Sequence, residues 1–248
     1  DVVYDSILKK TRKRIHESIG NAIEQLHADK LDEQYGPLVN HFSASENCRK
    51  VAYYSRLASM KAESSLSLND AALFAKIWVR ALEKLPKSEM LLREIIKART
   101  ALGFLEFRVS NMAEAKKSIE PIADAFLQHN LKTEQGLAWV ILGSHKYMVE
   151  EEVVESIRYL ERAIGIAEET GDIITSAYAQ YMMGLVLAFN CDFEKAIHYF
   201  EVLLGLSEAM AFPWRISVMK SNLSVYGYNY HGMVTEGHQS SREAVHIA

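Results

Sequence analysis

The sequence predicts an all-α protein in which antiparallel helix pairs stack into a right-handed superhelix, or solenoid. Two observations predict this class: a repeat of about forty residues runs along the chain, and each repeat unit shows the apolar spacing of amphipathic helices. The composition agrees, since four prolines and twelve glycines among 248 residues leave room for long helices. No segment shows the sustained two-residue alternation that is typical of a strand.

The repeat is marked first by an apolar residue followed by a small one. This pair recurs after 40, 41 and 40 residues, at Leu102-Gly103, Leu142-Gly143, Met183-Gly184 and Leu223-Ser224. A second small residue follows 12 or 13 positions later, at Ala115, Ser156, Ala196 and Gly237. Because small residues let two backbones approach closely, the two marks predict the points where paired helices cross.

An apolar stripe follows the second mark. Apolar residues come four positions later at Ile119, Leu160 and Phe200, and seven positions later at Ile122, Ala163, Leu203 and Ala244. Turn signals lie between the two marks, at Ser110-Asn111, Asn190-Cys191-Asp192 and Gly232. Others separate one pair from the next, at His129-Asn130-Leu131 and at Glu169 to Asp172, where Gly171 is placed to end a helix. The spacing predicts helices of roughly 16 to 18 residues.

The first half of the chain continues the pattern less regularly. A further pair is expected from Arg49 to Pro86, because the proline blocks the helix from continuing. Two more helices are expected from Val2 to His41, interrupted at Asp29 to Asp32 and again around Gly36-Pro37. We expect residues 1–48 to form a helical segment that follows an upstream domain, and residues 49–248 to form the repeat array. The first residue is Asp1 rather than methionine, and we expect the chain to be a piece of a longer protein.

The second repeat resembles a known repeat family. Trp139-Val-Ile-Leu142-Gly143 is similar to the W-x-x-L-G opening of a tetratricopeptide repeat. The resemblance implies a tetratricopeptide-like solenoid whose first helices line a concave face. A forty-residue unit exceeds the usual 34, so longer helices are implied.

The first eighty residues resemble a second pattern. The residues that carry it are Val3-Tyr4-Asp5-Ser6-Ile7-Leu8, Arg12-Lys13-Arg14-Ile15-His16, Ile19, Ala22-Ile23-Glu24, Leu38, His41-Phe42, Ala52-Tyr53-Tyr54 and Ala58. They resemble the segment after the ATPase module in bacterial signalling ATPases of the adenylate/guanylate cyclase type and in regulators similar to the maltose activator. The chain departs from that pattern at Ile7 and at Asn40-His41-Phe42. The resemblance implies a regulatory arm, since the catalytic groups of that family lie in other domains.

Charge and motifs exclude several functions. A net charge of −4 and a pI near 6.2 give no general attraction to phosphate backbones or anionic lipid, so neither nucleic acid nor membrane is an expected partner. The basic run from Lys9 to Arg14 is best interpreted as a solvated helix face. No glycine-rich phosphate loop, H-E-x-x-H or G-x-S-x-G motif occurs. Cys48 and Cys191 stand far apart without a Cys/His cluster, which favours a reducing cytoplasm.

The remaining polar clusters have structural interpretations. Glu150-Glu151-Glu152 with Glu155 should lie at a helix start, where carboxylates favour the positive end of the helix dipole. Tyr230-His231, His238 and His246 are expected to be turn and surface residues. We therefore predict no catalytic residues, no metal site and no cofactor for this chain.

A binding face is predicted by counting along the first helix of each pair from its small residue. The residues one, four and five positions after it, and three and six before it, should project from the exposed side. The candidates for a partner-binding groove are Lys97, Phe104, Phe107, Arg108, Ser144, Tyr147, Tyr178, Tyr181, Tyr228 and Asn229. Tyrosine combines a large contact area with a polar tip, which is enriched at binding hot spots. The alternative is that tight curvature buries these rings as core.

The leading functional hypothesis is a protein-interaction and regulatory module that holds a peptide, a partner domain or a neighbouring domain of its own polypeptide. A second hypothesis makes the chain the regulatory fragment of a nucleotide cyclase. A third makes it the small-molecule-sensing arm of a transcription activator. The sequence does not choose among them, and self-association stays open.

Overall fold

The computed structural model describes residues 8–211 and 213–248, and within them it contains helices and connecting turns and no strand. The predicted all-α class is confirmed. The chain forms two compact units, which meet in sequence at His129 and Asn130, and each is described by itself. Residues 1–7, which carry the first part of the second sequence resemblance, lie outside the described residues.

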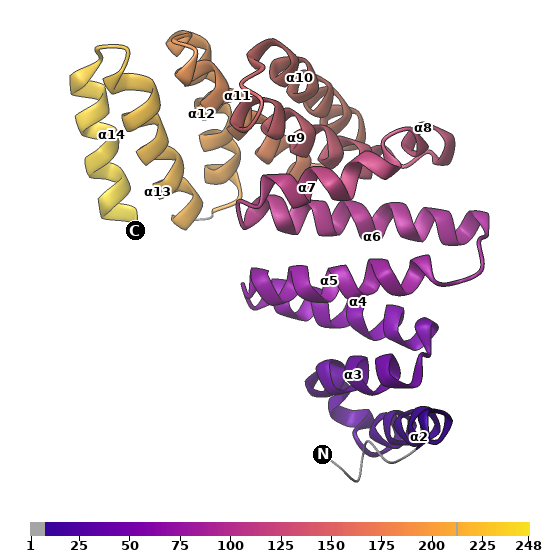
Figure 1. Ribbon diagram of the computed structural model, residues 1–248. Helices are drawn as coiled ribbons and strands as arrows, with labels where there is room; N and C mark the ends of the chain where they lie inside the picture. The colour runs from indigo at the N-terminus through magenta and orange to yellow at the C-terminus, as the bar shows by residue number, and fades with distance from the viewer. Residues whose placement is uncertain (1–7, 212) are drawn as a thin grey trace. The chain divides into compact units, whose positions relative to one another are not determined.

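Unit 1, which ends at His129, consists of three stacked helix pairs (Figure 1). Its elements are α2 (Lys9–Leu26), η1 (Ala28–Gln34), α3 (Tyr35–Ser45), α4 (Cys48–Ser64), α5 (Leu68–Glu83), α6 (Glu89–Arg108), α7 (Met112–Ile119), η2 (Glu120–Ile122) and α8 (Ala125–His129). Its core runs through α3 to α6 and includes Leu38, Phe42, Ala71, Ala75 and Ala98, all at most 1% exposed.

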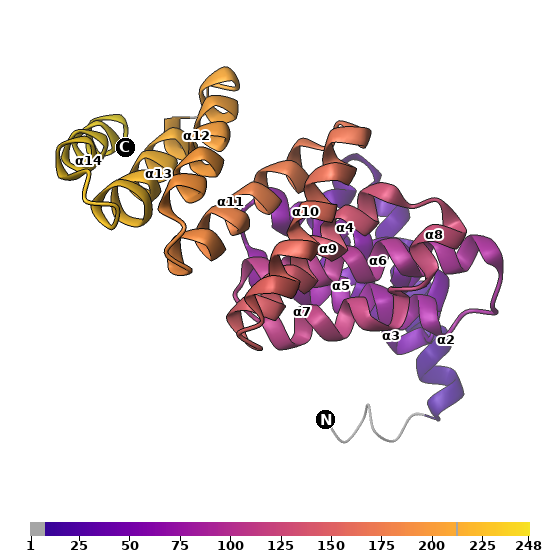
Figure 2. The same cartoon turned by 90° about the horizontal axis from the view of Figure 1, so that it is seen from above.

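Unit 2, which begins at Asn130, consists of three further pairs. Its elements are α9 (Lys132–Met148), α10 (Val153–Thr170), α11 (Ile173–Phe189), α12 (Phe193–Ala209), α13 (Pro213–Asn222), the π-helical segment η3 (Leu223–Asn229) and α14 (Val234–Ile247). Figures 1 and 2 show α11 between the α9–α10 pair on one side and α12 and α13 on the other. Helices α9 to α12 are 17 or 18 residues long, which confirms the predicted length.

The small residues lie at helix crossings, as predicted. A Cβ atom placed on Gly143 of α9 would come within 3.0 Å of Tyr159 Cβ and 3.2 Å of the Ser156 carbonyl oxygen on α10. A Cβ on Gly184 of α11 would come within 2.6 Å of the fully buried Phe200 ring on α12. Gly143 and Gly184 therefore each lie against the second helix of their own pair.

The predicted turns also occur where the turn signals stand. Gly171 ends α10 at a φ of 69°, in the left-handed region that glycine adopts without a steric penalty. The turn residues Ser110, Cys191 and Gly232 likewise have positive φ angles, of 62°, 62° and 83°. Each closes one helix pair.

The first copy departs from the expected helix length. Its second helix, α7, has only eight residues and is followed by the short elements η2 and α8. Pro121 explains the early end, because proline cannot donate the next helical hydrogen bond and its ring clashes with the carbonyl group one turn earlier. The prediction of 16 to 18 residues was wrong for this helix.

The N-terminal region forms the two expected helices, with one difference. The chain kinks at Lys30 inside η1, near the predicted interruption. Gly36 and Pro37, however, lie in the first turn of α3 rather than between helices. Proline is tolerated there because the first amides of a helix have no partner within the helix.

Polar contacts fasten α2 to the helices beside it. Glu24 accepts hydrogen bonds from Tyr54 Oη and Lys50 Nζ of α4, both at 2.6 Å. Gly20 lies so close to the buried Phe42 ring that a Cβ atom would approach it to 2.7 Å. Helix α2 is thus part of the stacked core.

The last pair has an irregular first helix. Helix α13 continues into η3, where the backbone hydrogen bonds widen to the π pattern. The two small residues of the fourth repeat are still in contact, because Ser224 Oγ donates a hydrogen bond of 2.7 Å to the Gly237 carbonyl oxygen on α14.

Candidate partner-binding surface

Helix α11 carries the central part of the candidate surface in unit 2. Tyr178, Tyr181 and Phe189 are separated by three and eight residues, so they lie along one side of the helix. Asp172 caps the helix by accepting hydrogen bonds from the Ile174 and Thr175 amides, at 3.0 and 3.3 Å. The cap fixes where the helix starts and hence the direction in which this side faces.

A pocket of about 230 Å³ opens beside the N-terminal half of α11. Its lining comes from α11, α12 and α13: Ala177, Tyr178, Tyr181, Leu203, Trp214, Arg215, Val218 and Met219. Ala177, Leu203 and Met219 are buried and form an apolar floor. Trp214 is 75% exposed and stands at the pocket with Arg215 beside it in the sequence. The pocket therefore offers apolar depth together with an exposed aromatic ring and a cation.

Tyr181 and Tyr178, which both line this pocket, are partly buried. The Tyr181 ring lies 6.4 Å from the Phe200 ring, and burial, followed by the nearby Tyr226, raises the pKa of its hydroxyl. Tyr178 is also half-buried. Neither ring is wholly core or wholly exposed.

A row of aromatic rings crosses the C-terminal half of α11. The Tyr147 ring of α9 lies 6.4 Å from the Phe189 ring of α11, which in turn lies 5.4 Å from the Tyr226 ring of η3. Phe189 is 56% exposed. Burial raises the pKa of the Tyr147 hydroxyl. Three successive first helices thus contribute one ring each to a continuous apolar strip.

Two candidates of the fourth copy point elsewhere. Tyr228 Oη donates a hydrogen bond of 3.1 Å to Glu201 on α12, and burial together with this carboxylate raises the Tyr228 pKa to about 12. The Asn229 side chain lies against Gly237 on α14. The π-helical turn explains the difference, because its wider turn rotates the residues after Ser224 away from positions counted at 3.6 residues per turn.

Ser144 is fully buried, and its hydroxyl donates a hydrogen bond of 2.7 Å to the Val140 carbonyl oxygen one turn earlier. Such a side chain has no surface to offer a partner. We leave Ser144, Tyr228 and Asn229 out of the surface that we propose below.

Unit 1 holds the other four candidates. Phe104 and Phe107 on α6 stack with ring centres 6.2 Å apart, and Phe107 is buried. The Arg108 guanidinium lies 5.6 Å from the Phe104 ring and bonds to Glu63 of α4. This cluster fastens two first helices together. Lys97 is exposed and pairs with Glu94 at 3.6 Å, about two turns before Phe104.

The sequence count missed Trp214, Arg215 and Tyr226. Trp214 and Arg215 open α13 next to Pro213, ten and nine positions before the small residue Ser224, and so fell outside the counted offsets. Their position could have been noticed in the sequence, because a tryptophan next to an arginine follows the proline that opens this helix. Tyr226 gave no signal, because its position depends on the π-helical turn.

The clusters that the sequence interpreted as structural have ordinary partners. Lys146 Nζ bonds to Glu150 and Glu152, at 2.5 and 2.7 Å, and Glu155 pairs with Arg158. In the described part of the chain, no three His, Cys, Asp or Glu side chains gather as a metal site would require. None of the helices described is long and apolar enough to cross a membrane.

No protein-family model matches the sequence, and no curated protein matches it either. Solved structures do. BtubC (BKLC) from P. vanneervenii aligns over 98% of this chain and 91% of its own, with a TM-score of 0.61 and 13% identity. A variant of a Podosopora anserina kinesin light chain with nearly identical TPR-like repeats aligns over 78% and 92%, with a TM-score of 0.56 and 14% identity. At these identities the likeness shows the fold, and the chain is an all-α solenoid of helix pairs like those of the tetratricopeptide repeat (TPR).

Proposed function

We propose that this chain is a protein-interaction module that binds an extended segment of a partner polypeptide along α11. The observation that carries the proposal is the pocket at Tyr178, Tyr181, Trp214 and Arg215. Tryptophan, tyrosine and arginine are the residues most enriched at binding hot spots, and these hot spots lie in well-packed pockets. The similar solved structures support a scaffold of this kind in general terms through their shared fold.

The exposed apolar surface supports a partner rather than solvent. Trp214 and Phe189 are 75% and 56% exposed, although both are large apolar side chains. Exposed apolar patches mark interaction sites, and Trp214 adjoins the pocket while Phe189 adjoins the aromatic row. Arg215 adds a donor that pairs favourably with a carboxylate of the partner. The partner segment should therefore carry a bulky apolar side chain with an acidic residue close to it.

The distance along α11 sets the length of the bound segment. From Tyr178 to Phe189 the helix rises about 16 Å at roughly 1.5 Å per residue. An extended chain covers about 3.3 Å per residue, so about five residues span the pocket and the aromatic row. The apolar side chain would fill the pocket, and the other end of the segment would lie on Phe189.

Selection of short peptides from a display library on the full chain, followed by affinity measurements on variants, tests this proposal. Trp214→Ala should weaken the selected peptides about thirtyfold, since loss of a hot-spot ring costs roughly 2 kcal/mol or more. Tyr230→Ala is the matched control, because Tyr230 is 64% exposed but stacks on Phe193 at the turn before α14. Equal affinities for the wild type and both variants would contradict the proposal.

A small-molecule ligand in the same pocket is the competing interpretation. Pockets for such ligands measure roughly 300–1,000 Å³, and a pocket of about 230 Å³ lined partly by an exposed ring fits a single side chain better. A thermal-shift screen against sugars and metabolites separates the two. A hit that raises the melting temperature of the wild type but not of Trp214→Ala would favour the sensing arm of a transcription activator.

We also propose, from the sequence resemblance, that the module belongs to a bacterial signalling ATPase of the cyclase type, acting in the cytoplasm. In this proposal residues 1–48 connect it to an upstream domain and residues 49–248 form the array. The bound segment would come from another protein or from a neighbouring domain of the same polypeptide. Cyclase or ATPase turnover in the full-length protein that changes with Trp214→Ala would support this context, and turnover independent of the array would contradict it.

A further inference from the structure

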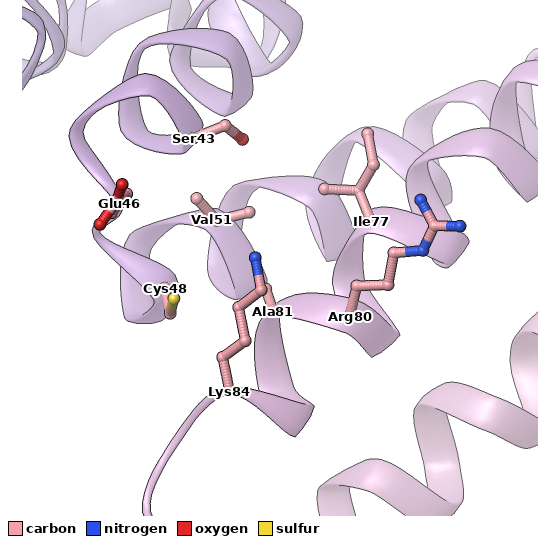
Figure 3. A pocket seen from close by; sticks show the side chains of 8 residues that line it. All are labelled: Ser43, Glu46, Cys48, Val51, Ile77, Arg80, Ala81 and Lys84. Atoms are coloured by element: carbon pink, nitrogen blue, oxygen red, sulfur yellow. The ribbon is translucent and has the colours of Figure 1, made fainter.

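A second pocket lies in unit 1, apart from the surface on α11. It measures about 440 Å³ and is formed by the end of α3, the start of α4 and the end of α5. Its lining residues are Ser43, Glu46, Cys48, Val51, Ile77, Arg80, Ala81 and Lys84 (Figure 3). The pocket lies between α3 and α5, the second helices of two successive pairs, so it is not part of a first-helix face.

Two cations of α5 line this pocket. Arg80 and Lys84 are one helical turn apart, and in Figure 3 the Lys84 side chain extends toward Val51 while the Arg80 side chain extends past Ile77. Among residues 8–211 and 213–248, no carboxylate lies within ion-pair distance of either one. Like charges four residues apart on a helix repel each other, and a bound anion would relieve this repulsion.

Glu46, the one carboxylate of the lining, is already engaged. Lys13 of α2 bonds to it, and Lys9 lies 3.7 Å away. The Lys13 hydrogen bond is the main cause that lowers the Glu46 pKa, so this carboxylate stays ionised and paired at neutral pH. The charge of Lys84 also lowers the Glu46 pKa, but neither Lys84 nor Arg80 forms an ion pair with this carboxylate, so the donors of both cations stay available for a bound anion.

The floor of the pocket is apolar. Val51 and Ala81 are 6% and 4% exposed and belong to the core of unit 1, and Ile77 packs against that core. The Ser43 hydroxyl at the edge adds a further donor. A guanidinium binds planar oxyanions through two parallel hydrogen bonds, and an apolar floor favours an alkyl group next to the anion.

We propose that this pocket binds an oxyanion, a carboxylate or a phosphate, carried on a short apolar body. Arg80 and Lys84 hold the oxyanion, and Val51, Ile77 and Ala81 contact the body. The proposal does not depend on partner binding along α11, because none of its residues belongs to unit 2.

Cys48 makes the proposal directly testable, because it is a free cysteine in the lining, whereas Cys191 is a free, exposed cysteine in the turn between α11 and α12. Maleimide labelling of the full chain, followed by mass spectrometry, measures both rates in one sample. Sodium hexanoate should slow labelling of Cys48 severalfold relative to chloride at the same ionic strength, while Cys191 keeps its rate. Acetate should protect less than hexanoate, because its apolar body is shorter. Inorganic phosphate, the other oxyanion, has no apolar body and should also protect less than hexanoate.

The variants decide whether the cations are responsible. The double variant Arg80→Gln with Lys84→Gln should need about ten times more anion for the same protection, the effect expected for lost charge-assisted hydrogen bonds. Lys87→Gln, an exposed lysine outside the lining, should behave as wild type. Equal slowing at both cysteines, or protection that survives in the double variant, would overturn the anion site. Equal protection by acetate and hexanoate would overturn the apolar body.

Discussion

Each glycine at a helix crossing fixes the distance between two helices. Gly184 lies against the Phe200 ring, which is fully buried, whereas Gly205 on α12 has no atom within 4 Å of the position of a Cβ. The same Gly→Ala change should therefore have opposite signs at the two sites. Gly184→Ala should cost roughly 1–3 kcal/mol through overpacking. Gly205→Ala should stabilise the chain by roughly 0.5–1 kcal/mol, because alanine loses less backbone entropy in a helix.

Urea unfolding of the two variants and the wild type measures these changes. The unfolding midpoint should fall for Gly184→Ala and rise for Gly205→Ala. Changes of equal sign and size would mean that Gly184 does not mark a crossing, and the repeat phase would then be wrong.

For single residues, the sequence predicts where two helices cross better than it predicts which side chains are exposed. Gly143 and Gly184 could be located because close approach of two helices restricts the residue type at one position in each repeat. Whether a tyrosine is exposed depends on which helices surround it. Tyr147 and Tyr228 occupy equivalent positions in the sequence count, yet Tyr147 joins the aromatic row and Tyr228 bonds to Glu201.

Between elements, the contact of α2 with α3 contains a pair of histidines. His16 Nδ1 lies 3.0 Å from His41 Nδ1, a distance at which one of the two nitrogens donates and the other accepts. Burial, followed by the charge of His16, lowers the pKa of His41 below its usual 6.5. The unfolded chain regains the usual pKa and so binds more protons below about pH 6.5. The fold should therefore lose stability as the pH falls from about 6.5.

Urea unfolding at pH 8 and pH 5.5 checks this expectation. The wild type should lose more of its unfolding free energy between the two values than His41→Gln, which has no second imidazole to protonate. His27→Gln removes an exposed histidine at the end of α2 and should keep the dependence of the wild type. An identical loss in all three proteins would show that the His16–His41 contact does not respond to pH.

Two elements show why lengths and registers were only partly predictable. Helix α7 ends early because of Pro121. The sequence contains this proline, but the predicted helix length was based on the forty-residue period. The π-helical segment η3, which packs against α12 and α14, has no such local signal in Leu223–Asn229. Positions counted at 3.6 residues per turn consequently do not apply within η3.

For the whole molecule, the division into two units limits what a repeat count can predict. The small-residue marks run from Gly103 through Ser224 with one period, yet the chain divides at His129, after the short α7 and α8. The positions counted from the small residue of each repeat implied one groove along all the repeats. The surface that we propose lies in unit 2, on α9, α11, α12, α13 and η3.

The most direct test of the proposed function is a hydroxyl-radical footprint of the whole chain, with and without a selected peptide. Oxidation of Trp214 and Phe189, the most exposed rings of the surface, should fall several-fold when the peptide binds. Exposed rings elsewhere, Tyr53 in unit 1 and Tyr230 before α14, should keep their rates. Protection of Tyr53 or Tyr230, with Trp214 and Phe189 still as reactive as in the free chain, would contradict binding along α11.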